Sequence, residues 1–261
     1  MPRPEPGNGS RGLGVTGGAR RPHSRKRWST IERDLRASLG PMLAGVDEVG
    51  RGPLAGPVVA CAVVMPPNER AIPGIDDSKK LSAATRLTLA LKIRERAVCL
   101  ALGAASVREI DRINIYQASA LAMHRALERL PLTPDHVVID GKHIRTLPVP
   151  HTAVVHGDSR CFSIACASIL AKVTRDRLMT ALGRRHPGYC WDTNAGYTTR
   201  DHVAGLASHG VTAHHRRSFW RIGQLTLDFD SIVADGGDEE AERLAQLIAA
   251  HADSDVEQLL A

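Results

Sequence analysis

Two adjacent carboxylates, Asp47 and Glu48, end an apolar run in the sequence G-V-D-E-V-G-R-G at positions 45–52. Their mutual repulsion has no obvious local relief, so the pair is a candidate for binding a cation. The Gly50-Arg51-Gly52 turn that follows exposes backbone amides and a guanidinium, which are groups that bind phosphate. Carboxylates for a metal ion beside donors for a phosphate indicate nucleic-acid chemistry.

Two further apolar runs of strand length are followed by carboxylates, Asp140 at the end of 136–140 and Asp158 after 152–156. If these strands lie side by side with the first, all four acids converge at one edge of a sheet. At an effective dielectric of 20, two carboxylates roughly 4 Å apart repel by about 4 kcal/mol, so such a group needs divalent cations. Oxygen ligands favour Mg²⁺ or Mn²⁺, and two such ions can hydrolyse a phosphodiester. Taken singly, Asp140 or Asp158 beside a glycine equally fits an ordinary turn residue.

The elements that must position these residues follow from hydrophobic periodicity. Two closely spaced apolar runs predict an antiparallel hairpin, and strands then alternate with helices, which predicts an α/β fold with a mixed sheet flanked by helices. Strands are expected at 42–48, 57–65, 97–107, 136–140 and 152–156. Helices are expected at 28–40, 83–95, 108–129, 160–184, 199–208 and 238–250.

Composition bounds the class of protein. The 261 residues are 43% hydrophobic, enough for a sizeable core, and no apolar run approaches the roughly 20 residues of a membrane span. No apolar segment typical of a signal peptide stands near the N-terminus, and five scattered cysteines favour small buried side chains over disulfides or a zinc site. These features predict a cytoplasmic protein with no membrane contact, and nothing indicates an obligate oligomer, so a monomer is expected.

Charge divides the chain into three parts, although the net charge is only +6. Residues 1–27 read as a disordered basic arm, and 225–261 hold ten acidic residues and one arginine, with a helix predicted inside this acidic tail. The catalytic domain is expected over 28–224, with a helical C-terminal part. Its basic balance fits a polyanion binder and equally an ordinary solvated surface. The arm either raises non-specific affinity for nucleic acid or has no role.

Several separated motifs together resemble one family, ribonuclease HII, the type 2 ribonucleases H, from about Leu43 to Phe219. The motifs are G-V-D-E-V-G-R-G-P-L-A-G-P-V-V-A at 45–60, D-S-K-K-L-S at 77–82, I-D-G at 139–141, G-D-S at 157–159, S-I-A-C-A-S-I-L-A-K-V-T-R-D at 163–176, N-A-G-Y at 194–197 and H-R-R-S-F at 215–219. The resemblance implies a ribonuclease H-like fold with a five-stranded mixed sheet, and a two-metal endonuclease using Mg²⁺ or Mn²⁺. It implies cleavage of RNA in RNA/DNA hybrids and 5′ of single ribonucleotides embedded in duplex DNA, leaving 3′-hydroxyl and 5′-phosphate ends. The implied role is ribonucleotide removal from DNA.

The resemblance also assigns site residues by their place in the motifs. The four metal-binding acids fall on Asp47, Glu48, Asp140 and Asp158. The element that senses the ribose 2′-hydroxyl falls on Gly50, Arg51 and Gly52, and the tyrosine that stacks on the neighbouring deoxyribose falls on Tyr197. This chain departs from the family pattern with Val49 for alanine, Ala195 for lysine and Thr198 for glycine, and the missing lysine removes one expected phosphate contact.

Four further polar residues are expected to touch the substrate or support the site: Lys79, Lys80, Ser168 and Lys172. The two loop lysines are candidates for a phosphate, and the other two share one face of the helix at 160–184. The run 214–217, His-His-Arg-Arg, is interpreted as a cluster contacting the nucleic-acid backbone. Two alternatives stay open, a DNA-cutting nuclease of the same fold and a non-catalytic hybrid-binding protein.

Overall fold

The computed structural model describes residues 28–68 and 70–219. The predicted basic arm at 1–27 and acidic tail at 225–261, with its helix at 238–250, lie outside the described residues. The division into arm, catalytic domain and tail therefore stays a prediction.

Five strands form one mixed sheet in the order β3-β2-β1-β4-β5. The central strand β1 pairs antiparallel with β2 and parallel with β4, where Val46 lies opposite Ile139. One position further along, the same register brings Asp47 and Asp140 to adjacent strand ends. The predicted hairpin and mixed sheet are confirmed. The strands are β1 (Leu43–Val49), β2 (Val58–Val64), β3 (Cys99–Ala105), β4 (His136–Asp140) and β5 (His151–Val154).

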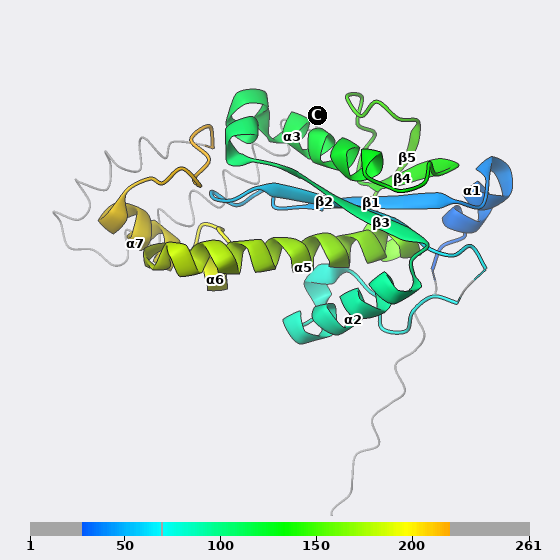
Figure 1. Ribbon diagram of the computed structural model, residues 1–261, viewed down its shortest axis with the longest axis horizontal. Coiled ribbons are helices and arrows are strands. Elements are labelled where there is room, and N and C mark those ends of the chain that lie inside the picture. Colours follow the sequence, from blue (N-terminus) through cyan, green and yellow to red (C-terminus); the bar gives the residue numbers. More distant parts are fainter. Residues whose placement is uncertain (1–27, 69, 220–261) are drawn as a thin grey trace, which may run out of the picture.

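Helices cover both faces of the sheet (Figure 1). Helix α3 (Val107–Glu128) packs on one face, while α5 (Phe162–Arg185) lies on the other, with α2 (Ala83–Arg96) against it. All seven side chains of β2 are buried, which explains its unbroken apolar sequence. The remaining helical elements are α1 (Ile31–Leu39), η1 (Ser78–Lys80), α4 (Gly157–Arg160), η2 (Pro187–Tyr189), α6 (Trp191–Asn194) and α7 (Arg200–His209). No helix in the described ranges is long and apolar enough to cross a membrane.

Small residues let α5 approach the centre of the sheet. A Cβ added at Gly45 in β1 would lie 2.6 Å from the backbone nitrogen of Ile164, so only glycine fits this contact. Ser163, Ala165 and Cys166 are fully buried where the helix crosses β1 and β2. The first half of α5 therefore lies directly beneath Asp47. The five cysteines are free thiols, and all except Cys190 are buried, as the sequence predicted.

Two predicted elements are wrong in detail. Strand β5 ends at Val154, because His156 adopts a left-handed conformation (φ 55°) that turns the chain away from the sheet. Asp158 therefore lies in the first turn of α4 and not at a strand end, and the predicted helix at 160–184 is divided at Cys161. Helix α3 contains a kink at Asn114 (φ 64°), whose side chain accepts a hydrogen bond from the backbone N–H of Gln117.

The contact between β3 and α3 gives a test of this packing. We expect Gly103→Ala to lower the free energy of unfolding by about 1–3 kcal/mol, because overpacking forces neighbouring groups apart. The added Cβ would meet the Ala122 carbonyl inside van der Waals contact, and it would lie 2.5 Å from the backbone nitrogen of Ala126. Urea unfolding followed by circular dichroism measures the change, and an unaltered midpoint would contradict this close approach.

Candidate active site

The first two carboxylates lie at the end of the central strand. Asp47 is 7% exposed and faces α5, where the Ser168 side chain donates a hydrogen bond to it. The backbone N–H of Glu48 donates to Oδ1 of Asp47 at 2.8 Å. Because neighbouring residues of a strand point to opposite faces, Glu48 leaves the sheet on the other side. Its Oε1 forms an ion pair with Nη1 of Arg51 at 3.2 Å.

The other two carboxylates reach the same edge from β4 and α4. Asp140 is the last residue of β4, and its Oδ1 accepts a hydrogen bond from the backbone N–H of Gly157 at 2.6 Å. This bond ties the end of β4 to the first turn of α4, which carries Asp158. The predicted convergence therefore occurs, although Asp158 reaches it from a helix.

The pKa values of three of the acids are raised by burial and by repulsion between neighbouring carboxylates. Burial raises the pKa of Asp47 well above its usual value, and the charges of Glu48 and Asp140 raise it further. Burial also raises the pKa of Asp140 and of Asp158, with added repulsion from Glu48 on the former and from Asp140 on the latter.

The donor set fits a hard divalent cation, since it consists of carboxylate oxygens whose repulsion a positive ion would relieve. Among the described residues, no three such side chains already form a metal-ligand cluster. The fit therefore rests on the oxygen donors and on the raised pKa values of Asp47, Asp140 and Asp158.

The turn after β1 has a conformation that requires glycine. Gly50 has φ +94°, and an added Cβ would collide with Nε of Arg175 and lie 2.9 Å from the Pro57 carbonyl. Arg51 is partly buried, and its Nε and Nη2 atoms are enclosed without any hydrogen-bond partner in the described structure. Two guanidinium donors beside the carboxylates thus lack a protein partner in the described structure.

Tyr197 lies across from this turn. Its side chain is 44% exposed, and its Cε1 would be 3.7 Å from a Cβ added at Gly52. The backbone carbonyl of Tyr197 accepts a hydrogen bond from Nδ1 of His202 at 2.9 Å. An exposed aromatic ring thus borders the glycine-arginine-glycine turn, and its contact with a ribose stays a prediction.

The four secondary candidates occupy different environments. Lys79 and Lys80 are exposed on η1, and the Lys79 charge partly offsets the raised pKa of Asp158, so it faces the acids. Ser168 is buried, and its Oγ lies 2.9 Å from Oγ of Ser78, which places it behind Asp47. Lys172 forms an ion pair with Asp176 at 2.7 Å.

Sequence reasoning missed the residues that support these loops, and it misplaced the run at 214–217. His215 and Arg216 are buried at 1% and 0% exposure, so they cannot belong to a surface cluster that contacts a nucleic-acid backbone. Arg216 and Arg175 instead bond to backbone carbonyls around the turn. His215 bonds to His202 at 3.1 Å, and burial lowers the pKa of His215 to about 3. The signals in the sequence were the basic character of this run and the place of Arg175 and Arg216 in the motifs at 163–176 and 215–219.

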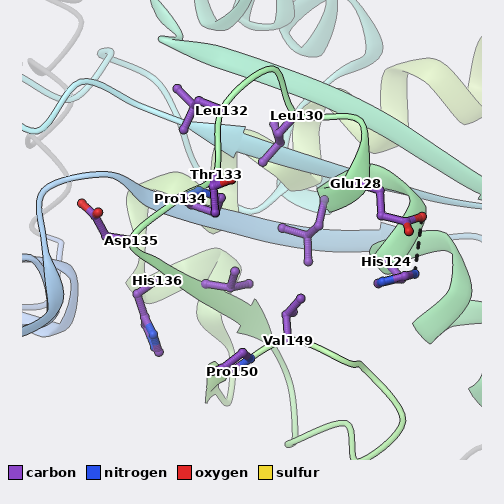
Figure 2. A pocket seen from close by; sticks show the side chains of 12 residues that line it. His124, Glu128, Leu130, Leu132, Thr133, Pro134, Asp135, His136, Val149 and Pro150 are labelled. Atoms are coloured by element: carbon purple, nitrogen blue, oxygen red, sulfur yellow. Dashed lines mark ion pairs between the residues drawn. The ribbon is translucent and has the colours of Figure 1, made fainter.

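A pocket of about 330 Å³ lies at the opposite end of the sheet. Figure 2 shows Asp135 and His136 at the start of β4, across the pocket from the His124–Glu128 ion pair at the end of α3. The ion pair has a nitrogen–oxygen distance of 3.5 Å. None of the predicted site residues lines this pocket. The predicted site residues instead lie at the other end of β4, where Asp140 is.

A mixed five-stranded sheet with carboxylates gathered at the end of its central strand defines a hydrolase of the ribonuclease H-like fold. Residues 44–222 match the family model "Ribonuclease HII". The chain belongs to the ribonuclease HII family, and it is accordingly a ribonuclease H.

Curated relatives agree with this assignment, and a solved structure shares the fold. The chain is 56% identical over 195 residues to ribonuclease HII from Gluconobacter oxydans, covering 73% of this chain and 94% of the relative. It is 53% identical over 195 residues to ribonuclease HII from Granulibacter bethesdensis, covering 73% and 89%. The crystal structure of ribonuclease H2 from Pyrococcus horikoshii OT3 has the same fold, with a TM-score of 0.60 at 23% identity over 72% of this chain and 98% of that one.

Proposed function

We propose that the protein is an endoribonuclease that hydrolyses the RNA strand of RNA/DNA hybrids and incises duplex DNA 5′ of single embedded ribonucleotides. Membership of the ribonuclease HII family supports ribonuclease H activity on RNA/DNA hybrids. The observation that carries the finer proposal is that β1 runs directly from two carboxylates into a glycine-arginine-glycine turn bordered by Tyr197. Groups for hydrolysis and groups for ribose recognition thus share one segment of chain.

Asp47, Glu48, Asp140 and Asp158 would hold two Mg²⁺ or Mn²⁺ ions. When bound, such ions neutralise the carboxylates, lower the pKa of water and stabilise charge on phosphate oxygens. Ser168 orients Asp47 through its hydrogen bond, and the Gly157 N–H orients Asp140. We expect these bonds to keep the ligand oxygens directed to the edge of the sheet.

The turn and the tyrosine would select the ribonucleotide. The Arg51 guanidinium holds Glu48 with one nitrogen and has two enclosed donors left for a phosphate. A 2′-hydroxyl both donates and accepts, so the exposed backbone of residues 50–52 can distinguish ribose from deoxyribose. The Tyr197 ring would stack on the sugar beside it, and Lys79 would contribute a point charge for the backbone.

Incision of a labelled duplex carrying one ribonucleotide, with Mg²⁺ or Mn²⁺, tests the proposal. The expected products are a 3′-hydroxyl and a 5′-phosphate, with the cut 5′ of the ribonucleotide and with an all-DNA duplex left intact. Equal cutting of the all-DNA duplex would favour a DNA-cutting nuclease. Tight binding without cleavage would favour a hybrid-binding protein.

Light scattering during size exclusion tests the expected monomer, and cell fractionation tests the expected cytoplasmic location.

Tyr197→Ala should reduce incision at a single ribonucleotide by roughly 10–100-fold, because a base or sugar stacked on an aromatic ring gains about 1–3 kcal/mol. Tyr197→Phe keeps the ring and should cleave at close to the wild-type rate. Incision rates and metal affinity are measured for both variants. A loss of metal affinity in Tyr197→Ala equal to its loss of rate would argue against a substrate contact.

A further inference from the structure

Two buried arginines lie beneath the turn that carries Gly50–Gly52. Arg175 comes from the middle of α5, and Arg216 comes from the segment after α7; both side chains are 0% exposed. Neither guanidinium forms an ion pair with a carboxylate in the described part of the chain, and burial lowers the pKa of each. Buried charge without a counter-ion is costly, so a physical reason for keeping both is needed.

The hydrogen bonds of these arginines supply that reason, because all six go to backbone carbonyls. Arg216 donates from Nη2 to Gly50 at 2.5 Å, from Nη1 to Arg51 at 2.8 Å and from Nε to Gly56 at 2.9 Å. Arg175 donates from Nη2 to Ala55 at 3.0 Å, from Nε to Pro57 at 2.9 Å and from Nη1 to Ala195 at 2.9 Å. Five of the six acceptors lie in the connection between β1 and β2, and the sixth lies two residues before Tyr197.

Drawing carbonyls inward turns the adjoining amides outward. In a trans peptide the C=O of one residue and the N–H of the next point in opposite directions. Since Arg216 holds the Gly50 and Arg51 carbonyls, the N–H groups of Arg51 and Gly52 face away from it. Neither amide donates to an acceptor in the described structure. The buried guanidinium therefore orients two unused donors and places positive charge behind them.

The same arginines connect the turn to the tyrosine loop. The N–H of Leu54 donates to the Gly196 carbonyl at 2.9 Å, and the N–H of Arg216 donates to the Leu54 carbonyl at 2.8 Å. Arg175 adds a second link, since one guanidinium bonds to both Pro57 and Ala195. The connection between β1 and β2 is thus fixed between the loop of Tyr197 and the segment of Arg216.

We propose that Arg175 and Arg216 are positioning residues that fix the Gly50–Gly52 turn and Tyr197 in one arrangement and so set the selectivity for a ribonucleotide. This inference rests on the proposed function, because it takes those groups as the ribose contacts. Neither arginine touches the substrate. Each acts through the backbone that it holds.

Arg216→Lys and Arg175→Lys test the inference, since an ammonium cannot reach three carbonyls in the planar geometry of a guanidinium. We expect kcat for incision at a single ribonucleotide to fall about tenfold or more, because small displacements of positioned groups lower reaction rates strongly. We expect a smaller change in KM, and we expect metal affinity to be unchanged. Without divalent metal, fluorescence anisotropy should show reduced preference for the ribonucleotide duplex over the all-DNA duplex. Wild-type values of kcat and of this preference in both variants would overturn the inference.

Ile93→Ala provides a control for loss of stability alone. Ile93 lies in α2 and is fully buried, away from the turn. At a temperature where every variant is folded, Ile93→Ala should keep the wild-type kcat and preference, whereas the arginine variants should not. If Ile93→Ala lost both to the same extent, general destabilisation would explain the arginine variants and the inference would fail.

Asp111→Ala disturbs the segment that carries Arg216 without replacing Arg216 itself. Oδ1 of Asp111 accepts from the Ser218 backbone N–H at 2.9 Å, and Oδ2 accepts from the Arg217 N–H at 3.1 Å, which holds the segment against α3. We expect a weaker loss of preference than in Arg216→Lys, with faster amide hydrogen exchange in residues 50–57.

Hydrogen exchange also separates this inference from the proposed function. If the wild type fails to incise, the function is wrong; unchanged exchange at 50–57 and 194–199 in both arginine variants would refute the positioning.

Discussion

Asp47→Asn is expected to lower the incision rate by roughly 10³-fold or more, since removing one preorganised charge-stabilising group costs about 10²–10³-fold and the ion itself would be weakened here. Asparagine keeps the shape of the side chain and can keep the hydrogen bond with Ser168, but it lacks the negative charge that a divalent cation requires. Binding of the duplex should be retained, because Asp47 is 7% exposed and makes little contact with a phosphate. Single-turnover incision and anisotropy measure the two quantities.

The same variant should be more stable than the wild type when divalent metal is removed. Burial and neighbouring carboxylates raise the pKa of Asp47 above its value in the unfolded chain. Such a group binds more protons when folded, so its contribution to stability is present below the unfolded pKa and is lost as pH rises through the folded pKa. The Tm of Asp47→Asn should therefore increasingly exceed that of the wild type as pH rises above about 4. Each 1 kcal/mol corresponds to about 2–4 °C.

Glu128→Gln is the matched control for this charge removal. Glu128 is an acid at the far end of the molecule, with a side chain 60% exposed and paired with His124. It should cleave like the wild type. An Asp47→Asn protein that cleaves normally would show that the four acids are not the catalytic centre.

Gly50→Ala is expected to have the second largest effect on the incision rate. A φ of +94° costs an alanine about 1–2 kcal/mol, and its Cβ would press on the Arg175 guanidinium beneath the turn. The turn must then move, and a displacement of about 1 Å can reduce a rate roughly 100-fold. We expect incision at a single ribonucleotide to fall by this factor while affinity for an all-DNA duplex is kept.

Gly74→Ala separates backbone strain from the collision. Gly74 has a similar φ of +89°, yet the nearest atom to its added Cβ is Cδ2 of Leu89 at 3.8 Å. It should lose stability through strain alone and keep its incision rate when folded. If both glycine variants lost activity equally, the contact with Arg175 would not be the cause.

Most of the sheet could be predicted because few structures other than strands are consistent with these sequence patterns. The unbroken apolar run of β2 and the close spacing after β1 predicted a buried hairpin, which the antiparallel register confirms. Asp47 and Asp140 could be expected together because apolar strands end at both. Asp158 was placed wrongly, because the turn after β5 depends on a left-handed His156, and histidine carries little signal for that conformation.

The support of the site could not be predicted from local patterns. Arg175 and Arg216 lie 41 positions apart, and although both stand in the family motifs, nothing in those motifs shows that the side chains are buried. Their burial depends on carbonyls that only the folded β1–β2 connection presents. The ribose contacts assigned to Gly50, Arg51, Gly52 and Tyr197 stay predictions. The same holds for the phosphate contacts of Lys79 and Lys80 and for the substrate or supporting contacts of Ser168 and Lys172.

Surface connections usually accept insertions and deletions with little loss. The connection between β1 and β2 is an exception, because five of its carbonyls are fixed by guanidiniums from two distant parts of the chain. A single inserted residue would take several of these carbonyls out of reach at once. We therefore expect the length of this connection to be invariant under selection for activity.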